Sequence, residues 1–210
     1  MKKIILFHLL FFVFALGAFS QKRNKHEERL EQVHVVIDSL SQYYTITDEG
    51  LLFSRVIQSP EYTKDALYVK VLEIFSSIYN NSKYVIQSKD KEEGFIIGKG
   101  DDEDIRYDNI SGGRHITTVH HTIKVEVREG RFKVSITLTD ANLAYYDMRG
   151  TKSFDYHHPI FNFYPFSGDK IKLKYRDDSF NTIKFSIINA NALLDRFESK
   201  VTKKDNSDDW

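Results

Sequence analysis

The chain has 210 residues, its 30 basic and 30 acidic side chains give a formal charge of zero, and it contains no cysteine. Such a balanced charge gives no overall attraction to nucleic acid or to an anionic membrane. Without a thiol, the chain has no disulfides, no thiolate metal site, no cysteine nucleophile and no lipid-modified N-terminal cysteine.

The first twenty residues are typical of a secretory signal peptide. Two lysines follow the initiating methionine, and Ile4 to Leu16 forms an almost unbroken apolar run. That run is shorter than the roughly 20 residues that a permanent membrane span needs. Ala18 and Ser20 place small residues at minus three and minus one of a cleavage site. We therefore expect cleavage between Ser20 and Gln21, export to the periplasm or the medium, and no membrane anchor.

The remaining chain divides into a leader, one domain and a tail. Residues 21–44 combine a dense run of charges with apolar residues at helical spacing, which predicts a charged leader and an amphipathic helix. Residues 45–201 are predicted to form a single α+β domain. Residues 202–210 form a charged tail.

The domain is predicted to begin with a strand and a helix. Residues 45–58 have strand character with a turn at Asp48–Gly50, and from Pro60 to about Asn80 the apolar residues follow a helical stripe. Ser59 or Thr63 is suited to cap that helix. The apolar side of the strand is predicted to be Leu51, Phe53, Val56 and Ile57.

Two further strands and a hairpin follow. Residues 84–88 and 95–98 are predicted as strands around a turn, whereas residues 101–113 are polar and contain glycine, which predicts a loop. From Thr118 to Thr139 apolar and polar residues alternate on both sides of Glu129-Gly130, a two-residue hairpin loop. This loop pairs Val127 with Phe132, Val125 with Val134, Ile123 with Ile136 and Glu126 with Lys133.

The last third of the chain is predicted to be less regular. Residues 141–178 are rich in aromatic side chains, and Pro159 and Pro165 are expected to prevent regular structure. Ile171 to Tyr175 is predicted as a short edge strand, and residues 182–201 as a final helix with a broad apolar stripe.

Three segments carry a resemblance to a known family: Phe53-x-x-Val56-Ile57 with Thr63 to Tyr68, Asp90 through Gly94 to Gly100, and Glu129-Gly130-Arg131-Phe132. Over Leu51 to Thr139 the chain is similar to secreted bacterial domains of unknown function that share a fold with the TATA-box-binding protein. The resemblance implies an α+β fold of order β-α-β-β-β-β-α, in which a curved antiparallel sheet has both helices packed on one face. It implies no activity.

The sequence identifies no catalytic or cofactor site. There is no Gly-x-Ser-x-Gly or Ser-x-x-Lys motif, and the acidic run 101–104 lacks the frame of a calcium loop. His120 and His121 are adjacent on a strand and so point to opposite faces; we expect His121 in the core. Nothing in the spacing of the histidines requires the alternative of a zinc site, which would combine His157 and His158 with His115 or His120.

The aromatic segment from Phe154 to Phe166 allows two interpretations. It is either a stacking platform or lid for a ligand, or it places Phe161, Phe163 and Phe166 into the open end of the core. The second is preferred. The polar sheet face lacks the apolar wedges that minor-groove binders insert into DNA, so nucleic acid is not expected as a partner.

We therefore expect an exported, soluble binding or interaction module without a cofactor, whose partner is an unknown protein or glycan of the cell envelope. One alternative is a carrier of an apolar small molecule in a cavity capped by residues 154–166. Another is an envelope hydrolase using carboxylates or histidines that the sequence does not pair. The candidate partner surface consists of His120, Thr122, Tyr156, His157, His158 and Tyr164.

Overall fold

The computed structural model of the chain describes residues 28, 31–33, 35–36, 38–78, 85–107, 112–170 and 173–202. The chain divides into two units, residues 1–42 and 43–210. In the first unit, the described residues between 28 and 41 are helical, which confirms the leader helix over that part. The signal peptide, the Ser20–Gln21 cleavage site and residues 203–210 lie outside the described residues.

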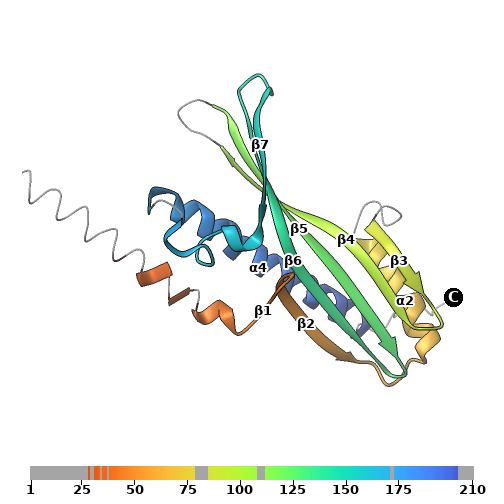
Figure 1. The fold of residues 1–210 in the computed structure, drawn as a ribbon. Helices are drawn as coiled ribbons and strands as arrows, with labels where there is room; N and C mark the ends of the chain where they lie inside the picture. Colours follow the sequence, from red (N-terminus) through yellow and green to blue (C-terminus); the bar gives the residue numbers. More distant parts are fainter. Residues whose placement is uncertain are drawn as a thin grey trace, which may run out of the picture. The chain divides into compact units, whose positions relative to one another are not determined.

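One antiparallel sheet organises the second unit (Figure 1). Its strand order is β1-β2-β6-β5-β4-β3, and β7 is paired to β6. The N-terminal half of β6 pairs with β2, and its C-terminal half pairs with β7. The strands are β1 (Thr45–Thr47), β2 (Gly50–Gln58), β3 (Ile86–Asp90), β4 (Phe95–Tyr107), β5 (Arg114–Arg128), β6 (Arg131–Tyr146) and β7 (Lys152–Pro159).

The predicted hairpin is confirmed with its register, since Val127 lies opposite Phe132 and Glu126 opposite Lys133. The strands around it are longer than predicted. The loop predicted for residues 101–113 is wrong over residues 101–107, because β4 continues to Tyr107 and pairs residue by residue with β5. Residues 108–111 lie outside the described residues. Polar residues are tolerated in this extension of β4 because their side chains can reach water.

The irregular structure predicted for residues 141–178 is also wrong over much of its length. β6 continues to Tyr146, and residues 152–159 form β7. Pro159 is the last residue of β7, so it interrupts no ladder. The predicted edge strand at Ile171–Tyr175 is wrong too, because α4 (Leu173–Thr202) begins there.

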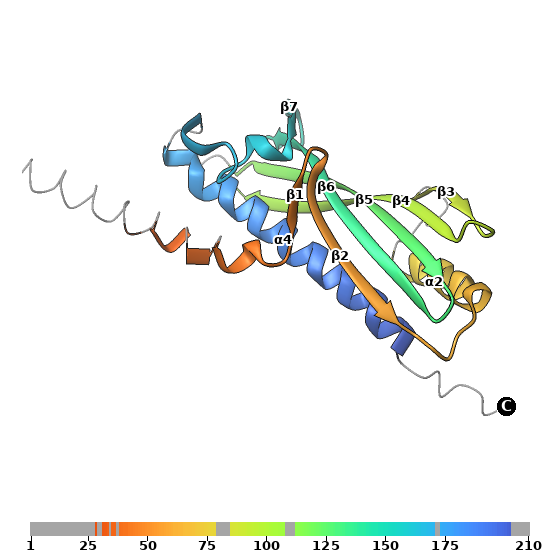
Figure 2. The same cartoon turned by 60° about the horizontal axis from the view of Figure 1, so that its bottom comes forward.

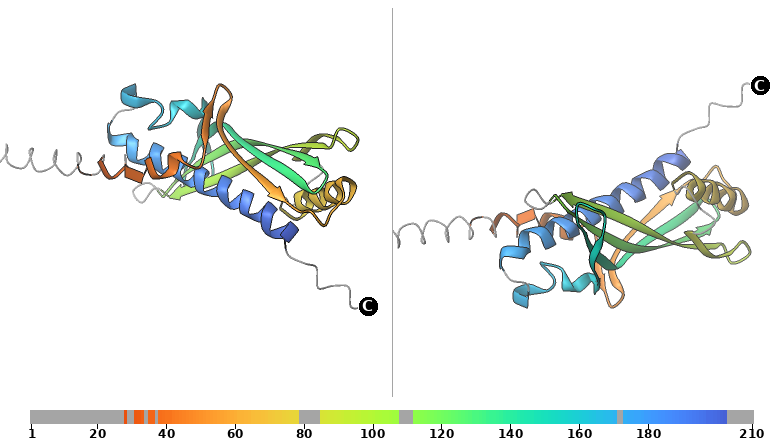
Figure 3. Two further views of the ribbon diagram at one scale, coloured as in Figure 1. Left: turned by 90° about the horizontal axis from the view of Figure 1, so that it is seen from below. Right: turned by 90° about the horizontal axis from the view of Figure 1, so that it is seen from above.

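Two helices pack on one face of the sheet, as the resemblance implies. α2 (Lys64–Ile78) contacts β5 and β6, α4 contacts β2, β4 and β6, and the two helices contact each other. Figures 2 and 3 show α4 running diagonally along the sheet, with α2 beside its C-terminal end. Thr63 caps α2 by accepting a hydrogen bond from the Ala66 N–H at 3.3 Å, which confirms one of the two predicted caps.

The core lies between the helices and alternate residues of the strands. Phe75 of α2 and Phe197 of α4 meet edge to face, with 5.5 Å between ring centroids. Val56 was predicted on this apolar side, but it is 52% exposed on the opposite face because β2 alternates regularly around it. The largest fully buried side chains include Phe53, Phe132, Ile96, Ile123, Ile136 and Leu138.

The segment after β7 fills the open end of the core. Ile160 in the short helix η1 (Ile160–Asn162) is fully buried, and Phe163 is nearly so. Phe166, just before η2 (Gly168–Lys170), packs edge to face against Phe161 and against Tyr44. The preferred interpretation of these phenylalanines as core-filling residues is confirmed for Phe163, whereas Phe161 and Phe166 are half-buried.

A bulge marks the point where β6 changes partner. His120 pairs with Asp140 but His121 pairs with Leu138, so Thr139 is the additional residue. Gly50 at the start of β2 lies against this point with a φ of +149°. A Cβ atom on Gly50 would stand 1.9 Å from the Leu138 carbonyl oxygen.

We predict that Gly50→Ala lowers the free energy of unfolding by roughly 2–4 kcal/mol, since the new methyl group both forbids the backbone conformation and displaces β6. Gly150→Ala is the matched control: its φ of +79° also favours glycine, but no atom lies within 4 Å of its Cβ position. The control should lose only about 1 kcal/mol. Urea unfolding of both variants tests this, and equal losses would show that contact with β6 is unimportant.

A histidine and an aspartate are buried together beneath α4. His121 of β5 is 4% exposed, as predicted for a core histidine, and its Nδ1 lies 3.5 Å from Oδ2 of Asp102 on β4. Burial lowers the pKa of His121 to about 4. Burial also raises the pKa of Asp102 to about 6, although a hydrogen bond with Asn189 and the charge of Arg196 oppose this. Relative to an exposed side chain, burial therefore shifts each group toward its neutral form.

These two shifts have opposite effects on stability between about pH 4 and 6. The raised pKa of Asp102 stabilises the fold at low pH, and this contribution is lost as the pH rises. The lowered pKa of His121 stabilises the fold at higher pH, and this contribution is lost as the pH falls. In the wild-type protein the two contributions largely offset each other.

The two offsetting contributions conceal a pH dependence of stability in the wild-type protein, and we predict that single variants reveal it. Relative to wild type, Asp102→Asn should gain stability by about 2–3 kcal/mol as the pH rises from 4 to 6.5, and His121→Gln should lose a similar amount. Urea unfolding of the three proteins across this range measures it. Because only differences from wild type are compared, other titrating groups cancel; two curves parallel to wild type would contradict the assignment.

Candidate functional site

The most exposed regular part of the sheet is an arm that projects beyond α4 at the top of Figure 1. We call it the distal arm and define it as residues 101–107, 114–120, 140–146 and 152–159. It contains the C-terminal halves of β4 and β6, the N-terminal half of β5 and all of β7. Most of the predicted candidate residues lie on it. Its two faces differ in chemistry.

One face of the distal arm carries a row of aromatic rings. Strand pairing places Tyr145 of β6 opposite both His115 of β5 and Phe154 of β7. From Phe154 the row continues along β7 through Tyr156 and His158. Val119 and Ala141, which are fully buried, lie on the same face. The row therefore extends the core-facing side of the sheet beyond the core. We call His115, Tyr145, Phe154, Tyr156 and His158 the aromatic ladder.

The rings of the aromatic ladder stack on one another. The centroids of Tyr145 and Phe154 lie 5.7 Å apart with an interplanar angle of 19°, and those of Phe154 and Tyr156 lie 5.4 Å apart at 27°. At its inner end, His158 meets the buried ring of Phe163 edge to face. Tyr156 is 57% exposed. The ladder therefore runs from the core into solvent, with ring edges rather than ring faces presented outward.

The opposite face of the distal arm is polar. His120 Nδ1 donates to Asp101 Oδ1 at 2.6 Å, and its Nε2 lies 3.9 Å from Asp140 Oδ1. His157 Nδ1 donates to the Asn142 side-chain oxygen at 3.0 Å and lies 3.7 Å from Asp140 Oδ1. These residues come from all four strands of the arm. Asp140 lies within 4 Å of both imidazoles and links the two hydrogen-bonded pairs into one polar network across the point where β6 changes partner.

The imidazoles do not converge on one point, as the ligands of a metal ion must. His157 and His158 are successive residues of β7, so they lie on opposite faces, with His157 near His120 and His158 on the ladder. Within the described ranges, no group of three or more His, Asp or Glu side chains has a geometry that could hold a metal ion. The predicted alternative of a zinc site therefore has no support in this arrangement.

The structure places the six predicted candidates in four different surroundings. Tyr156 and His158 belong to the aromatic ladder, and His120 and His157 to the polar network. Thr122 lies on the polar face nearer the hairpin, opposite Thr137. Tyr164 is only 4% exposed, and its backbone N–H donates to the Ser179 hydroxyl at 2.7 Å, so it contributes nothing to the surface.

Sequence reasoning missed the partners that complete both faces. Asp101, Asp140 and Asn142 fall in segments predicted as loop or irregular, and Tyr145 was not assigned to a strand. The signal was the length of the alternation, which continues outward on both sides of the predicted hairpin. Extending the register of the predicted hairpin would have placed Tyr145 opposite Arg114, and only the bulge at Thr139 moves it to His115, so periodicity alone could not have identified this pair.

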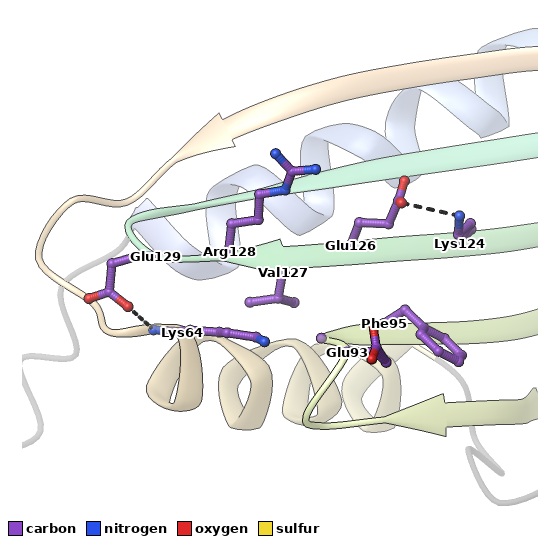
Figure 4. Close-up of a pocket in the computed structure, with 9 residues that line it drawn as sticks. Lys64, Glu93, Phe95, Lys124, Glu126, Val127, Arg128 and Glu129 are labelled. Carbon is purple, nitrogen blue, oxygen red and sulfur yellow. Dashed lines mark hydrogen bonds and ion pairs between the residues drawn. The ribbon is translucent and has the colours of Figure 1, made fainter.

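A hollow of about 520 Å³ lies at the other end of the sheet, between the first turn of α2, the β3–β4 turn and the end of β5. Figure 4 shows Glu129 at Lys64, where its carboxylate accepts the backbone N–H at 2.9 Å, and Glu126 paired with Lys124 at 3.2 Å. Besides Gly94, Phe95 and Val127, the lining is three basic and three acidic side chains: Lys64, Lys124, Arg128, Glu93, Glu126 and Glu129.

This hollow has no net charge to select an ion. An adjoining hollow of about 320 Å³ is lined by residues of β2, β5 and β6, including Val56 and Arg131. Neither hollow is lined by residues 154–166, which would cap the cavity of the predicted carrier. The distal arm is therefore the stronger candidate site.

Comparison with known proteins supports the fold. Residues 53–141 match the model of a domain of unknown function (DUF4468) with TBP-like fold. No curated protein matches the chain. In the described part of the chain, no helix is long and apolar enough to cross a membrane.

Two crystal structures resemble the chain over most of its length. A DUF4468 family protein from Bacteroides ovatus has 14% identity and a TM-score of 0.52, covering 78% of this chain and 93% of that one. A TBP-like protein from Parabacteroides distasonis has 10% identity and a TM-score of 0.51, covering 76% and 97%. At these identities the likeness concerns the fold alone. Residues 53–141 are therefore similar to the DUF4468 domain of unknown function, and the chain has a TBP-like fold.

Proposed function

We propose that this protein is an exported binding module whose partner is a protein of the cell envelope, bound by the aromatic ladder. The observation that carries the proposal is the exposed outer part of the ladder, above all Tyr156 at 57% exposure. Tyrosine and other aromatic residues are enriched at the energetic centres of protein interfaces, because they bury a large apolar area and keep a polar tip. Histidine rings at both ends of the ladder add further polar tips.

The stacking geometry favours a protein over a glycan. A sugar ring binds by lying on an open aromatic face, but the faces of Tyr145, Phe154 and Tyr156 are turned toward one another. What remains outward is a row of ring edges, hydroxyl groups and imidazoles. Such a row suits apolar and hydrogen-bonding side chains of a polypeptide, which pack between ring edges.

The polar face of the distal arm is the weaker candidate. His120 and Asp101 already form a short hydrogen bond, and His157 donates to Asn142. A partner would have to replace these bonds as well as displace water, which reduces the net gain from burying them.

Export is supported by the sequence of the first twenty residues, and the cysteine-free fold does not depend on disulfides. The buried apolar core between the sheet and the helices supplies stability without them. An envelope partner follows from export. Nothing in the balanced charge or the polar sheet face favours nucleic acid.

We predict that a photocrosslinking residue, p-benzoylphenylalanine, placed at Tyr156 in producing cells gives a discrete adduct with one envelope protein. Val56 is the matched control position, because it is 52% exposed but lies on the other face and away from the distal arm. Mass spectrometry of the adduct identifies the partner and distinguishes it from a crosslink between two copies. The same spectra show whether the chain begins at Gln21.

With the partner purified, Tyr156→Ala should weaken binding by about tenfold or more, as for an aromatic residue at an interface centre. Val56→Ala should leave the affinity unchanged. No adduct, equal adducts from both positions, or an adduct that glycosidases remove would each overturn the proposal. The last result would point to a glycan partner.

A further inference from the structure

The smaller hollow, on the helix-free face of the sheet, carries an excess of positive charge. Its volume is about 320 Å³, and its lining is three basic side chains, one carboxylate and two apolar residues: Arg128, Arg131, Lys133, Glu126, Val56 and Phe132. Figure 4 shows Arg128 directed away from Lys64 and toward β6. Because Glu126 is already bonded to Lys124 at 3.2 Å, it leaves the basic groups largely uncompensated.

The three basic side chains have no partner of their own. Among the described residues, Arg128, Arg131 and Lys133 take part in no side-chain hydrogen bond or ion pair. Basic residues of the distal arm differ in this respect, since Arg106 and Lys152 are each ion-paired with an aspartate. An anionic occupant of the hollow therefore gains contacts without displacing an existing ion pair.

α4 brings the end of the described chain close to this hollow. Near the C-terminal end of α4, Glu198 accepts a hydrogen bond from Arg55 of β2 at 2.6 Å, and Val201 is buried. Arg55 directly precedes Val56, which lines the hollow from the opposite face of the sheet. Figure 2 shows the end of α4 beside the end of β2. The segment that follows Thr202 therefore starts beside β2, across the sheet from the hollow.

We propose that residues 205–210 pass around the edge of β2 and occupy this hollow. The segment reads Asp-Asn-Ser-Asp-Asp-Trp, so three carboxylates meet three unpartnered cations. Trp210 supplies an apolar ring for Val56, which is 52% exposed. The two lysines before the segment suit the end of α4, because cations are stabilised at a helix C-terminus. The change from basic to acidic along the tail therefore follows the change in its surroundings.

The edge of β2 is open along the required path. β1 pairs with β2 only through residues 50–52, and among the described strands none lies outside the rest of β2. The eight residues after Thr202 can span up to roughly 26 Å when extended, whereas packed layers of secondary structure lie about 10 Å apart. Tethering also keeps the local concentration of the segment in the millimolar range, so weak surface ion pairs are sufficient.

Docking of the tail does not depend on the function proposed above. The hollow lies at the hairpin end of the sheet, whereas the aromatic ladder lies on the distal arm. Loss of tail docking would leave the crosslink from Tyr156 unchanged, and loss of binding at the ladder would leave the tail in the hollow.

The first test uses Trp210, the only tryptophan of the chain, as its reporter. In the full chain at low salt we expect acrylamide to quench Trp210 slowly, because the docked ring is shielded by β2. The hollow variant, Arg131→Glu with Lys133→Glu, should raise the quenching constant by about twofold or more. High salt should do the same in the wild type, since it screens the ion pairs.

Lys89→Glu with Lys99→Glu is the matched control, because it makes the same change in net charge at exposed lysines of β3 and β4. The control should leave the quenching of Trp210 unchanged. Circular dichroism verifies that both variants are folded. Equal quenching of the wild type and the hollow variant, or an equal increase in both variants, would overturn the proposal.

The second test exchanges the charges. Asp208→Lys with Asp209→Lys should expose Trp210 as fully as the hollow variant does, and combining these changes with Arg131→Glu and Lys133→Glu should restore its protection. Protection of the wild type should also persist on about hundredfold dilution, because the contact lies within one molecule. Failure of the combined variant to protect Trp210 would refute docking. Loss of protection on dilution would refute it too, by showing that the tail occupies the hollow of another copy.

Discussion

The exchange of partners by β6 is the constraint on which the rest of the structure depends. Its first half pairs with β2 over the helices, and its second half pairs with β7 in the distal arm. The bulge at Thr139 and the close approach of Gly50 allow this exchange within one continuous strand. Without it β6 would have to end near the core. The arm, with its two chemically different faces, would then have no support.

α4 supports both parts of the sheet through polar contacts near its two ends. Arg55 of β2 donates to Asp195 and Glu198 at 2.7 and 2.6 Å. Arg106, at the outer end of β4, donates to the Thr182 hydroxyl at 3.0 Å and to Asp104 at 2.8 Å. Partly exposed ion pairs contribute little stability individually. The contacts of Arg55 and Arg106 fix the direction of α4, whereas apolar contacts pack α4 against the sheet.

Sequence periodicity predicted the part of the fold in which one face is buried. The hairpin register, α2 with its Thr63 cap and the burial of His121 followed from alternation and spacing, because burial forces apolar residues onto one side. The distal arm escaped prediction because most of its side chains are at least partly exposed, so the alternation of polar and apolar residues is weaker there than in the core strands. Tyr156 and His158 were identified individually, but their neighbours Tyr145 and His115 are brought to them only by strand pairing.

The extent of the family match indicates why the candidate binding surface lies in the distal arm. The matched residues 53–141 end where β6 begins to pair with β7. They include the core strands and α2, whose alternation is fixed by packing. The second half of β6, β7 and α4 follow the match. Packing under the helices leaves few side chains free for recognition, whereas an arm built on the same strands offers a face to partners. Recognition through the arm, as proposed, would separate the residues that determine stability from those that determine binding.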